Sequence, residues 1–285
     1  MGRFSRLEPL VSIVTPTYNQ AQFIEETIRS VKAQDYPHIE HLILDDASTD
    51  HTREILQRYE GTYAMRWSAQ AHEGQAAQIR RGFARAGGEI FAWLNSDDVY
   101  LPGAVSAAVE ALQRAPDADL IYGNVIVIDG EGRPLGRRVL TTLDCDDFLG
   151  LGNCLAQPAT FWTRDIYERV GGVNPNYYFQ MDLDFFIRVA REGRLRHLRR
   201  DLAEIRMHAD GKMVKADHIR RQELALLQQR YLRPGELQRF RYSRMRLTAR
   251  QFLRYVSQGD LEYVSRRALS RMADAAGMRV GGGAR

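Results

Sequence analysis

The chain of 285 residues lacks the features that mark a disulfide scaffold or a zinc site. Its two cysteines, Cys145 and Cys154, are too few for a disulfide framework. Neither lies in a Cys-x-x-Cys pair or near histidines at the spacing that zinc sites use. We therefore interpret both as ordinary reduced thiols.

Long apolar runs are also missing. The two longest stretches without Asp, Glu, Lys or Arg, 9–24 and 148–163, are about 16 residues each and contain polar side chains. A transmembrane helix needs about 20 mainly apolar residues. The first six residues lack the apolar region of a secretory signal. The expected location is the cytoplasm, with peripheral contact at the inner face of the membrane left open.

The overall composition is that of a folded chain. Hydrophobic residues make up 44% and charged residues 27%, which excludes a disordered, collagen-like or coiled-coil protein. The net charge of +4 is unevenly divided, because residues 215–285 hold 16 Lys and Arg against 6 Asp and Glu. A basic tail on an acidic body suggests an anionic partner, such as a membrane surface or nucleic acid, or a solvated helical face.

Strands and helices are predicted to alternate through the first third of the chain. Apolar runs predict strands at 10–15, 41–44, 65–69 and 89–94. Helical spacing predicts a helix from residue 23 to 31, with Asn19 as its N-cap and Gln22 in the capping-box position. Further helices are predicted at 52–59 and 75–86. This alternation implies right-handed βαβ units and a mostly parallel sheet.

The second half is predicted to be less regular. We expect a helix at 102–114 with Pro102 in its first turn, and a hairpin formed by 119–129 and 135–139. A short strand at 157–162 and a helix at 181–191 follow, the latter with Phe185, Phe186 and Val189 facing inward. From residue 214 onward only helical patterns remain.

Polar residues follow three of the predicted strands at their carboxyl ends, where ligands bind on such sheets. These are Thr17, Asp46 and the run from Asn95 to Asp98. Asp97 and Asp98 are adjacent like charges, and a divalent cation bound through hard oxygen ligands would relieve their repulsion. The alternative is an Asx turn leading into the next helix.

Four motifs in register give these residues a context. They are Ser-Ile-Val-Thr-Pro-Thr-Tyr-Asn at 12–19, Asp-Asp-Ala-Ser-Thr-Asp at 45–50, Trp-Leu-Asn-Ser-Asp-Asp at 93–98 and Gln-Met-Asp-Leu-Asp at 180–184. In this order and spacing, and with Gln157-Pro158 and His208 beside them, the chain resembles the family 2 glycosyltransferases over about residues 9–213. The resemblance implies the GT-A fold, a Rossmann-like central sheet flanked by helices with a small antiparallel hairpin. It also implies a transferase that inverts the anomeric centre of a nucleotide-diphospho-sugar.

The resemblance implies a donor site at the first two strand ends and the following loops. Thr15, Pro16, Thr17 and Tyr18 resemble the loop under the nucleotide base, and Asp46 resembles the carboxylate that binds base or ribose. Asn95 replaces the first Asp of the family's DxD element, which leaves a ribose contact, and Ser96 follows it. Backbone amides before Gln75, at a predicted helix start, could face the donor phosphates.

A metal site is implied by the same element. Asp97 resembles the final Asp of DxD, which reaches the metal and through it the β-phosphate, and His208 lies where many relatives place a second ligand. The expected cofactor is Mn²⁺ or Mg²⁺, whose Lewis acidity would assist departure of the diphosphate. Arg80 and Arg81 are further candidates to assist it, with a solvated helix face as the alternative.

Asp182 matches the general base of the family's Glu-Asp element, in which Met181 replaces the usual Glu. Asp184 lies about 200° around the helix from Asp182, so both cannot face the acceptor. We interpret Asp184 as a structural cap or an acceptor contact. Gln157 resembles an acceptor-side position, and for the nearby Phe161 and Trp162 core packing is the alternative.

The predicted function is a hexosyltransferase-type enzyme of cell-surface polysaccharide or glycolipid synthesis. The expected donors are UDP-, GDP- or dTDP-sugars, and the expected acceptor is a saccharide or a lipid-linked sugar. A nucleotidyltransferase or a dinucleotide-binding domain is disfavoured, because residues 16–19 contain no glycine. The remaining alternative is a catalytically inactive sugar-nucleotide binder or scaffold.

The domain division that we expect is a GT-A domain over 1–214 and a basic helical extension over 215–285. Apolar residues at helical spacing alternate with arginines between residues 220 and 256. Such a segment could lie on an anionic bilayer, or pack as a lid on the body or a second subunit. Nucleic acid is not expected, because no recognition motif accompanies the charge.

Overall fold

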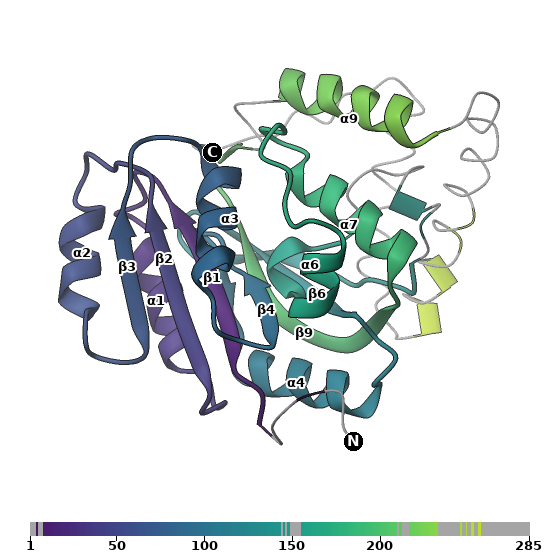
Figure 1. The fold of residues 1–285 in the computed structure, drawn as a ribbon, viewed down its shortest axis with the longest axis horizontal. Coiled ribbons are helices and arrows are strands. Elements are labelled where there is room, and N and C mark those ends of the chain that lie inside the picture. Colours follow the sequence, from purple (N-terminus) through teal and green to yellow (C-terminus); the bar gives the residue numbers. More distant parts are fainter. Residues whose placement is uncertain are drawn as a thin grey trace.

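A sheet of nine strands forms the centre of the described protein (Figure 1). The structure is a computed structural model that describes residues 4, 8–143, 145, 147–148, 155–209, 211–212 and 217–232, together with the single positions 246, 249, 252, 253, 256 and 257. Within this part, no helix is both long enough and apolar enough to span a membrane.

The first third of the chain alternates strands and helices, as the apolar pattern predicts. The elements are β1 (Val11–Thr17), α1 (Ile24–Lys32), β2 (Ile39–Asp45), α2 (Thr52–Tyr59), β3 (Met65–Ala69), α3 (Gln75–Arg85) and β4 (Ile90–Trp93). Strands β3, β2, β1 and β4 lie in that order and all pair in parallel. The βαβ architecture predicted from the alternation is therefore confirmed.

The second half completes the sheet. Its elements are β5 (Val99–Tyr100), α4 (Ala104–Arg114), β6 (Leu120–Asp129), β7 (Pro134–Arg138), η1 (Gln157–Ala159), β8 (Thr160–Thr163), α6 (Arg164–Arg169), α7 (Met181–Glu192), β9 (Leu195–Met207) and α9 (Asp217–Tyr231). From β4 the order continues β8, β6, β9 and β5, with the predicted hairpin strand β7 on β6. Strands β6 and β9 pair in parallel, whereas β8, β7 and β5 are antiparallel to their neighbours.

Three elements, β5, α6 and β9, escaped the sequence prediction. The longest of them is β9, whose first half carries exposed arginines and shows no regular alternation of buried and exposed residues. Its pairing with β6 over nearly the full length of that strand, and with β5, holds it in place. Strand formation here depends on tertiary pairing more than on intrinsic propensity.

Three local predictions were wrong. Helix α1 has Phe23 as its N-cap without a side-chain bond, whereas Asn19 has a left-handed backbone (φ 51°) and accepts the Thr49 N–H at 2.8 Å. Asparagine tolerates this conformation, and its side chain ties the first two loops together. Pro102 precedes α4, whose N-cap Gly103 has φ 72°. The predicted strand at 157–162 begins as the 3₁₀ turn η1.

Helices cover both faces of the sheet. In Figure 1, α3 and α6 lie in front of the strands and α1 lies behind them. Successive residues of β2 alternate between the two layers, because side chains on a strand alternate between faces. Leu42 and Leu44 belong to the main core cluster with Ile79 and Phe83 of α3, while Ile43 belongs to a second cluster with residues of α1 and α2.

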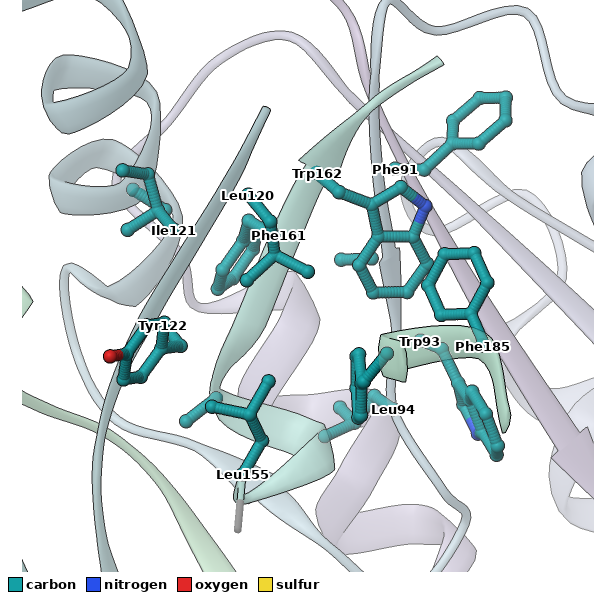
Figure 2. Close-up of a cluster of buried hydrophobic side chains, with 14 of the residues drawn as sticks. Phe91, Trp93, Leu94, Leu120, Ile121, Tyr122, Leu155, Phe161, Trp162 and Phe185 are labelled. Carbon is teal, nitrogen blue, oxygen red and sulfur yellow. The ribbon is translucent and has the colours of Figure 1, made fainter. Parts of the chain in front are cut away.

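Aromatic side chains fill the middle of the main core (Figure 2). Phe161 and Trp162 of β8 are fully buried. The ring of Trp162 lies 5.1 Å from that of Phe185 on α7, and Phe161 stacks on Tyr100 at 5.5 Å. These two aromatics therefore pack in the core, which was the alternative to an acceptor-side role. Phe185, Phe186 and Val189 are buried as predicted.

Gly82 marks the close approach of α3 to β1. A Cβ added there would lie 2.5 Å from Val14 Cγ1 and 2.9 Å from a Leu44 methyl. Alanine is a better helix former by about 1 kcal/mol, but overpacking costs about 1–3 kcal/mol, so Gly82→Ala should lower the melting temperature. Gly136→Ala, where nothing lies within 4 Å, is the control in thermal unfolding. A Gly82→Ala protein as stable as wild type would contradict this packing.

Helix α9 packs against the body. Leu227 is 1% exposed and belongs to the main core cluster. Tyr231, at the end of the helix, packs against the same cluster. Figure 1 shows α9 beside the loop that leads into α7. The predicted pattern from residue 233 onward lies outside the described residues, apart from six single positions. Membrane contact and oligomerisation through this extension remain predictions, as does the domain boundary at residue 214.

Candidate functional site

The carboxyl ends of β1, β2 and β4 meet at one edge of the sheet, as parallel pairing requires. The Asp46 N–H donates to the Thr17 carbonyl at 2.9 Å, and the Leu94 N–H donates to the Val14 carbonyl at 3.0 Å. The loops that follow these strands therefore start side by side. They carry the residues predicted to bind the donor and the metal.

The predicted base-binding loop divides into inner and outer residues. Thr15 is fully buried, with its Oγ1 2.9 Å from Nε2 of His41, and Pro16 is buried next to it. The Thr17 hydroxyl is buried and has no hydrogen-bond partner among the described residues. Tyr18 is 47% exposed and its ring lies 4.8 Å from that of His72. Thr17 and Tyr18 thus hold the unused polar group and the open aromatic face of this loop.

Asp46 organises the loop before α3. Its carboxylate accepts the N–H groups of Glu73 and Gly74 at 2.8 and 3.0 Å and the Gln78 amide at 2.6 Å. The side chain is nearly fully buried. Asp46 therefore sets the position of the loop that begins α3 at Gln75. A contact of Asp46 with base or ribose stays a prediction.

The side chain of Asn95 forms hydrogen bonds with four other side chains of the site. Its Oδ1 accepts from Gln75 Nε2 at 2.9 Å and from Trp93 Nε1 at 2.8 Å. Its Nδ2 donates to Asp98 Oδ2 and Gln157 Oε1, both at 3.1 Å. Residues from α3, β4 and η1 are joined in this way around one amide. Ser96, which follows, is buried.

Asp97 and His208 come together from distant parts of the chain. His208 Nε2 lies 3.1 Å from Asp97 Oδ2, and its ring packs 4.6 Å from that of Phe23. The Asp97 side chain is 24% exposed, so it remains accessible. Asp98 instead is buried, and its Oδ1 accepts the Arg206 N–H. Burial raises the pKa of Asp98 well above its usual value, and the charge of Asp97 adds to this rise.

The pair of Asp97 and His208 fits a hard divalent cation that keeps several other ligands. One carboxylate oxygen and one imidazole nitrogen converge there, and the carboxylate is open to solvent. Among the described residues no group of three or more His, Cys, Asp or Glu could hold a metal. Mg²⁺ and similar ions are commonly held by one or two protein groups, with phosphate and water oxygens supplying the rest.

The two carboxylates of α7 have different environments. Asp182 is partly exposed at the first turn, and its Oδ1 accepts its neighbour Leu183 N–H at 2.7 Å. Asp184 is 1% exposed and is held by Arg188 at 2.6 Å and by the Tyr231 hydroxyl at 2.7 Å. This placement supports the structural interpretation of Asp184 over an acceptor contact. Gln157, the other predicted acceptor-side residue, is likewise buried in the Asn95 network.

Lys212 is a site residue that the sequence reasoning missed. Its Nζ donates to Gln75 Oε1 at 2.9 Å and to the Tyr178 carbonyl, and lies 4.1 Å from the centre of the Tyr178 ring. Burial lowers its pKa to about 8, although the nearby charges of Asp182 and Glu223 oppose the shift. A usable signal existed: the chain has only three lysines, and this one lies four residues after His208.

Arg80 and Arg81 are engaged elsewhere. Arg80 donates to the Val173 carbonyl at 2.9 Å, and Arg81 pairs with Glu73 at 2.8 Å. The cation that the fold brings to Gln75 is therefore Lys212. These contacts favour a role of the two arginines on the helix face over assistance to the diphosphate.

Similarity to solved structures supports the fold. The chain superimposes on Staphylococcus aureus TarS with a TM-score of 0.60 at 18% identity, covering 70% of this chain and 37% of TarS. A TarS structure of residues 1–349 in complex with UDP-GlcNAc gives a TM-score of 0.58. The mannosyltransferase PcManGT from Pyrobaculum calidifontis, in complex with GDP-Man and Mn²⁺, gives 0.60 at 17% identity, covering 92% of this chain and 81% of that protein. The GT-A architecture expected from the sequence is confirmed.

Sequence relatives carry the same class of name. A glycosyltransferase of Nostoc sp. that is itself uncharacterised is 29% identical over 229 residues, 75% of this chain and 70% of the relative. TuaG of Bacillus subtilis, named for teichuronic acid biosynthesis, is 36% identical over 132 residues, which span 46% of this chain and 52% of TuaG. Residues 12–171, more than half of the chain, match the family described as Glycosyl transferase family 2. The chain is a glycosyltransferase that belongs to this family.

Proposed function

We propose that the protein transfers a hexosyl group from a nucleoside-diphosphate sugar to an acceptor hydroxyl, with inversion at the anomeric carbon. The observation that carries the proposal is the convergence of Asp97, His208, Gln75 and Lys212 at the carboxyl edge of the sheet, with Asp182 nearby on α7. Two solved structures of similar fold contain UDP-GlcNAc and GDP-Man, which supports a donor of this class.

The nucleoside end of the donor is proposed to bind at the first two loops. Tyr18 offers an open aromatic face for the base, and the Thr17 hydroxyl has unused hydrogen-bonding capacity. A buried hydroxyl without a partner is costly unless a ligand satisfies it. Asn95 would reach the ribose by exchanging one of its present hydrogen bonds, for example the one from Gln75. The Glu73 and Gly74 amides before α3 already donate to Asp46, so they do not support the expected contact of these amides with the donor phosphates.

The diphosphate end is proposed to lie between Asp97 and Lys212. Asp97 and His208 would hold Mn²⁺ or Mg²⁺, which as a Lewis acid would neutralise charge developing on the leaving oxygens. A similar fold contains Mn²⁺ together with GDP-Man. Lys212, as a partly buried ammonium, would supply a fixed positive charge from the protein itself.

Asp182 is proposed as the general base. Its carboxylate would take the proton of the acceptor hydroxyl while that oxygen forms a bond to the anomeric carbon. The bond from the anomeric carbon to the phosphate oxygen breaks, and its electron pair leaves with the nucleoside diphosphate. A partly exposed carboxylate at the first turn of a helix can be reached by such an acceptor.

The acceptor is proposed to be a saccharide or a lipid-linked sugar of a cell-surface polysaccharide. TuaG is named for teichuronic acid biosynthesis, which supports this class of acceptor, although its match covers less than half of this chain. We propose that the reaction takes place in the cytoplasm or at the inner membrane face, where nucleotide sugars and lipid-linked acceptors meet.

Activity should depend on the charge of Lys212. Because its pKa is about 8, the ammonium is present below that pH and lost above it. The groups that face it are Asp182, Glu223 and Tyr178. We expect kcat/KM to fall above about pH 8, approaching tenfold per pH unit, in a pH profile of donor turnover.

Lys212→Arg supplies the control for this pH dependence. Arginine stays charged throughout the range, so this variant should lose the alkaline decline even if its maximal rate is lower. An unchanged alkaline decline in Lys212→Arg would assign the titration to another group.

A thermal-shift screen of UDP-glucose, UDP-GlcNAc, dTDP-glucose and GDP-mannose, with and without Mn²⁺, tests the proposed function. A ligand that binds only the folded state raises the melting temperature, by an amount that grows with concentration over Kd. We expect one nucleotide class to stabilise the protein, and more strongly with Mn²⁺. Hydrolysis of that donor would distinguish an enzyme from an inactive binder. Failure of every donor to stabilise or react would refute the proposal.

A further inference from the structure

Glu223 of α9 binds the segment that leads into the proposed base. Its Oε1 accepts the Tyr178 N–H at 2.7 Å, and its Oε2 accepts the N–H groups of Phe179 and Gln180, both at 2.8 Å. The side chain is 9% exposed. Three consecutive backbone amides thus point at one buried carboxylate that lies more than 40 residues further along the chain.

This contact holds the two residues before the N-cap of α7 and the amide of the N-cap itself, Gln180. The first amides of a helix have no partners inside it and need capping groups. Gln180 is the N-cap of α7 and makes no side-chain capping bond, and its own amide side chain instead donates to the Arg220 carbonyl of α9 at 3.1 Å. The negative charge of Glu223 also lies at the end of α7 where the helix dipole favours it. The start of α7, with Asp182 in its first turn, therefore depends on α9.

The same segment connects Glu223 to Lys212. In the peptide group between Tyr178 and Phe179, the N–H donates a hydrogen bond to Glu223. The carbonyl oxygen of the same group accepts a hydrogen bond from Lys212 Nζ. Lys212 in turn donates to Gln75 at the start of α3. One peptide unit, fixed at both ends, thus links α9 to the donor side of the site as well as to α7.

We propose that Glu223 is a positioning residue of the active site, which holds residues 178–180 so that Asp182 and Lys212 keep their working geometry. The inference rests on the proposed roles of those two residues. It also assigns α9 to the catalytic unit, because a chain ending at residue 214 would lack Glu223. Misplacement of a reacting group by about 1 Å can cost on the order of 100-fold in rate, so a residue without substrate contact can matter.

Hydrogen exchange of the full-length protein tests directly whether Glu223 holds residues 178–180. In Glu223→Gln the neutral amide cannot accept all three N–H groups, and its NH₂ end faces donors. We expect the amides of residues 178–180 to exchange at least about tenfold faster than in wild type, because local opening controls exchange. Leu226→Ala, at an exposed position one turn further along the same helix, should leave their exchange unchanged.

Kinetics test the positioning role. With whichever of UDP-glucose, UDP-GlcNAc, dTDP-glucose or GDP-mannose the wild type turns over, Glu223→Gln should lower kcat at least about tenfold and change the donor KM by less than about threefold. Ile55 is a buried residue of α2 in the second core cluster, which includes no residue of α9. Ile55→Ala should therefore lower stability without changing a contact of α9. Measured well below its melting temperature, that variant should keep the wild-type kcat.

The outcomes are separable. Unchanged exchange at residues 178–180 in Glu223→Gln would show that Glu223 does not hold this segment and overturns the proposal. Faster exchange with an unchanged kcat overturns the positioning role. A kcat loss that Ile55→Ala shares at equal melting temperature assigns the effect to stability and also overturns it. If the wild type neither binds nor turns over any of the four donors, the proposed function fails. The exchange experiment still decides whether Glu223 holds residues 178–180.

Discussion

Replacing Asp182 with asparagine is expected to lower the turnover number by at least about 100-fold, while the affinity for the donor stays near that of wild type. General-base catalysis contributes on the order of 10² to 10⁴ in rate, and the amide cannot take the acceptor proton. Donor binding should survive, because the residues proposed to bind the donor lie on the loops after β1, β2 and β4. Steady-state kinetics and calorimetric titration of the donor would measure the two effects separately.

Asp184→Asn is the matched control for this experiment. It makes the same chemical change two residues further along α7, but at a buried carboxylate that pairs with Arg188 and Tyr231. Breaking a buried ion pair from one side costs about 3–5 kcal/mol, so this variant should be less stable. Its turnover per folded molecule should exceed that of Asp182→Asn by at least about tenfold. A loss of donor affinity in Asp182→Asn, with turnover retained, would refute Asp182 as the base.

Replacing Asp97 with alanine is expected to abolish the Mn²⁺-dependent part of nucleoside diphosphate binding. Asp97 and His208 are the proposed metal ligands, and no group of three or more possible ligands lies among the described residues, so removing Asp97 leaves a single proposed ligand. Isothermal titration of UDP or GDP, with Mn²⁺ and after chelation, would give the metal-dependent increment. In wild type, removal of the metal should weaken binding in the same way.

Asp98→Asn is the control for the metal site. This neighbour is buried and accepts the Arg206 N–H and an Asn95 amide hydrogen, so its carboxylate is engaged within the protein and is not a proposed metal ligand. Metal-dependent binding should therefore persist in Asp98→Asn. Mn²⁺-dependent binding that survives in Asp97→Ala would place the metal elsewhere.

Much of the architecture could be predicted from periodicity. The strands and helices up to β4 appear within about two residues of their predicted positions, because apolar runs of strand length alternate there with amphipathic helices. The parallel order then brings Thr17, Asp46 and Asn95 to one edge, since ligands bind beyond the carboxyl ends of such strands. Asp97 and His208, paired from the family resemblance alone, do lie within hydrogen-bonding distance.

Other features had no local signal. Strand β9 is rich in arginine, and it forms because β6 and β5 supply its hydrogen-bond partners. Asn19 resembles a helix cap in sequence, but its side chain bonds to the next loop. Phe161 and Trp162 could have served an acceptor or the core, and only the packing of β8 against Phe185 and Tyr100 decides for the core.

The sequence by itself determined the parallel strands up to β4, the family and the motif residues of the site, because these depend on patterns within a few consecutive residues. Only the tertiary structure decided how the site is held. Lys212 reaches Gln75 across 137 residues, and Glu223 reaches the amides before Asp182 across more than 40. Hydrogen bonds of this kind join segments that approach only after the core has packed. In the described part of the basic tail, Glu223 of α9 is buried and binds the three amides before α7, a contact that the composition of the tail does not indicate.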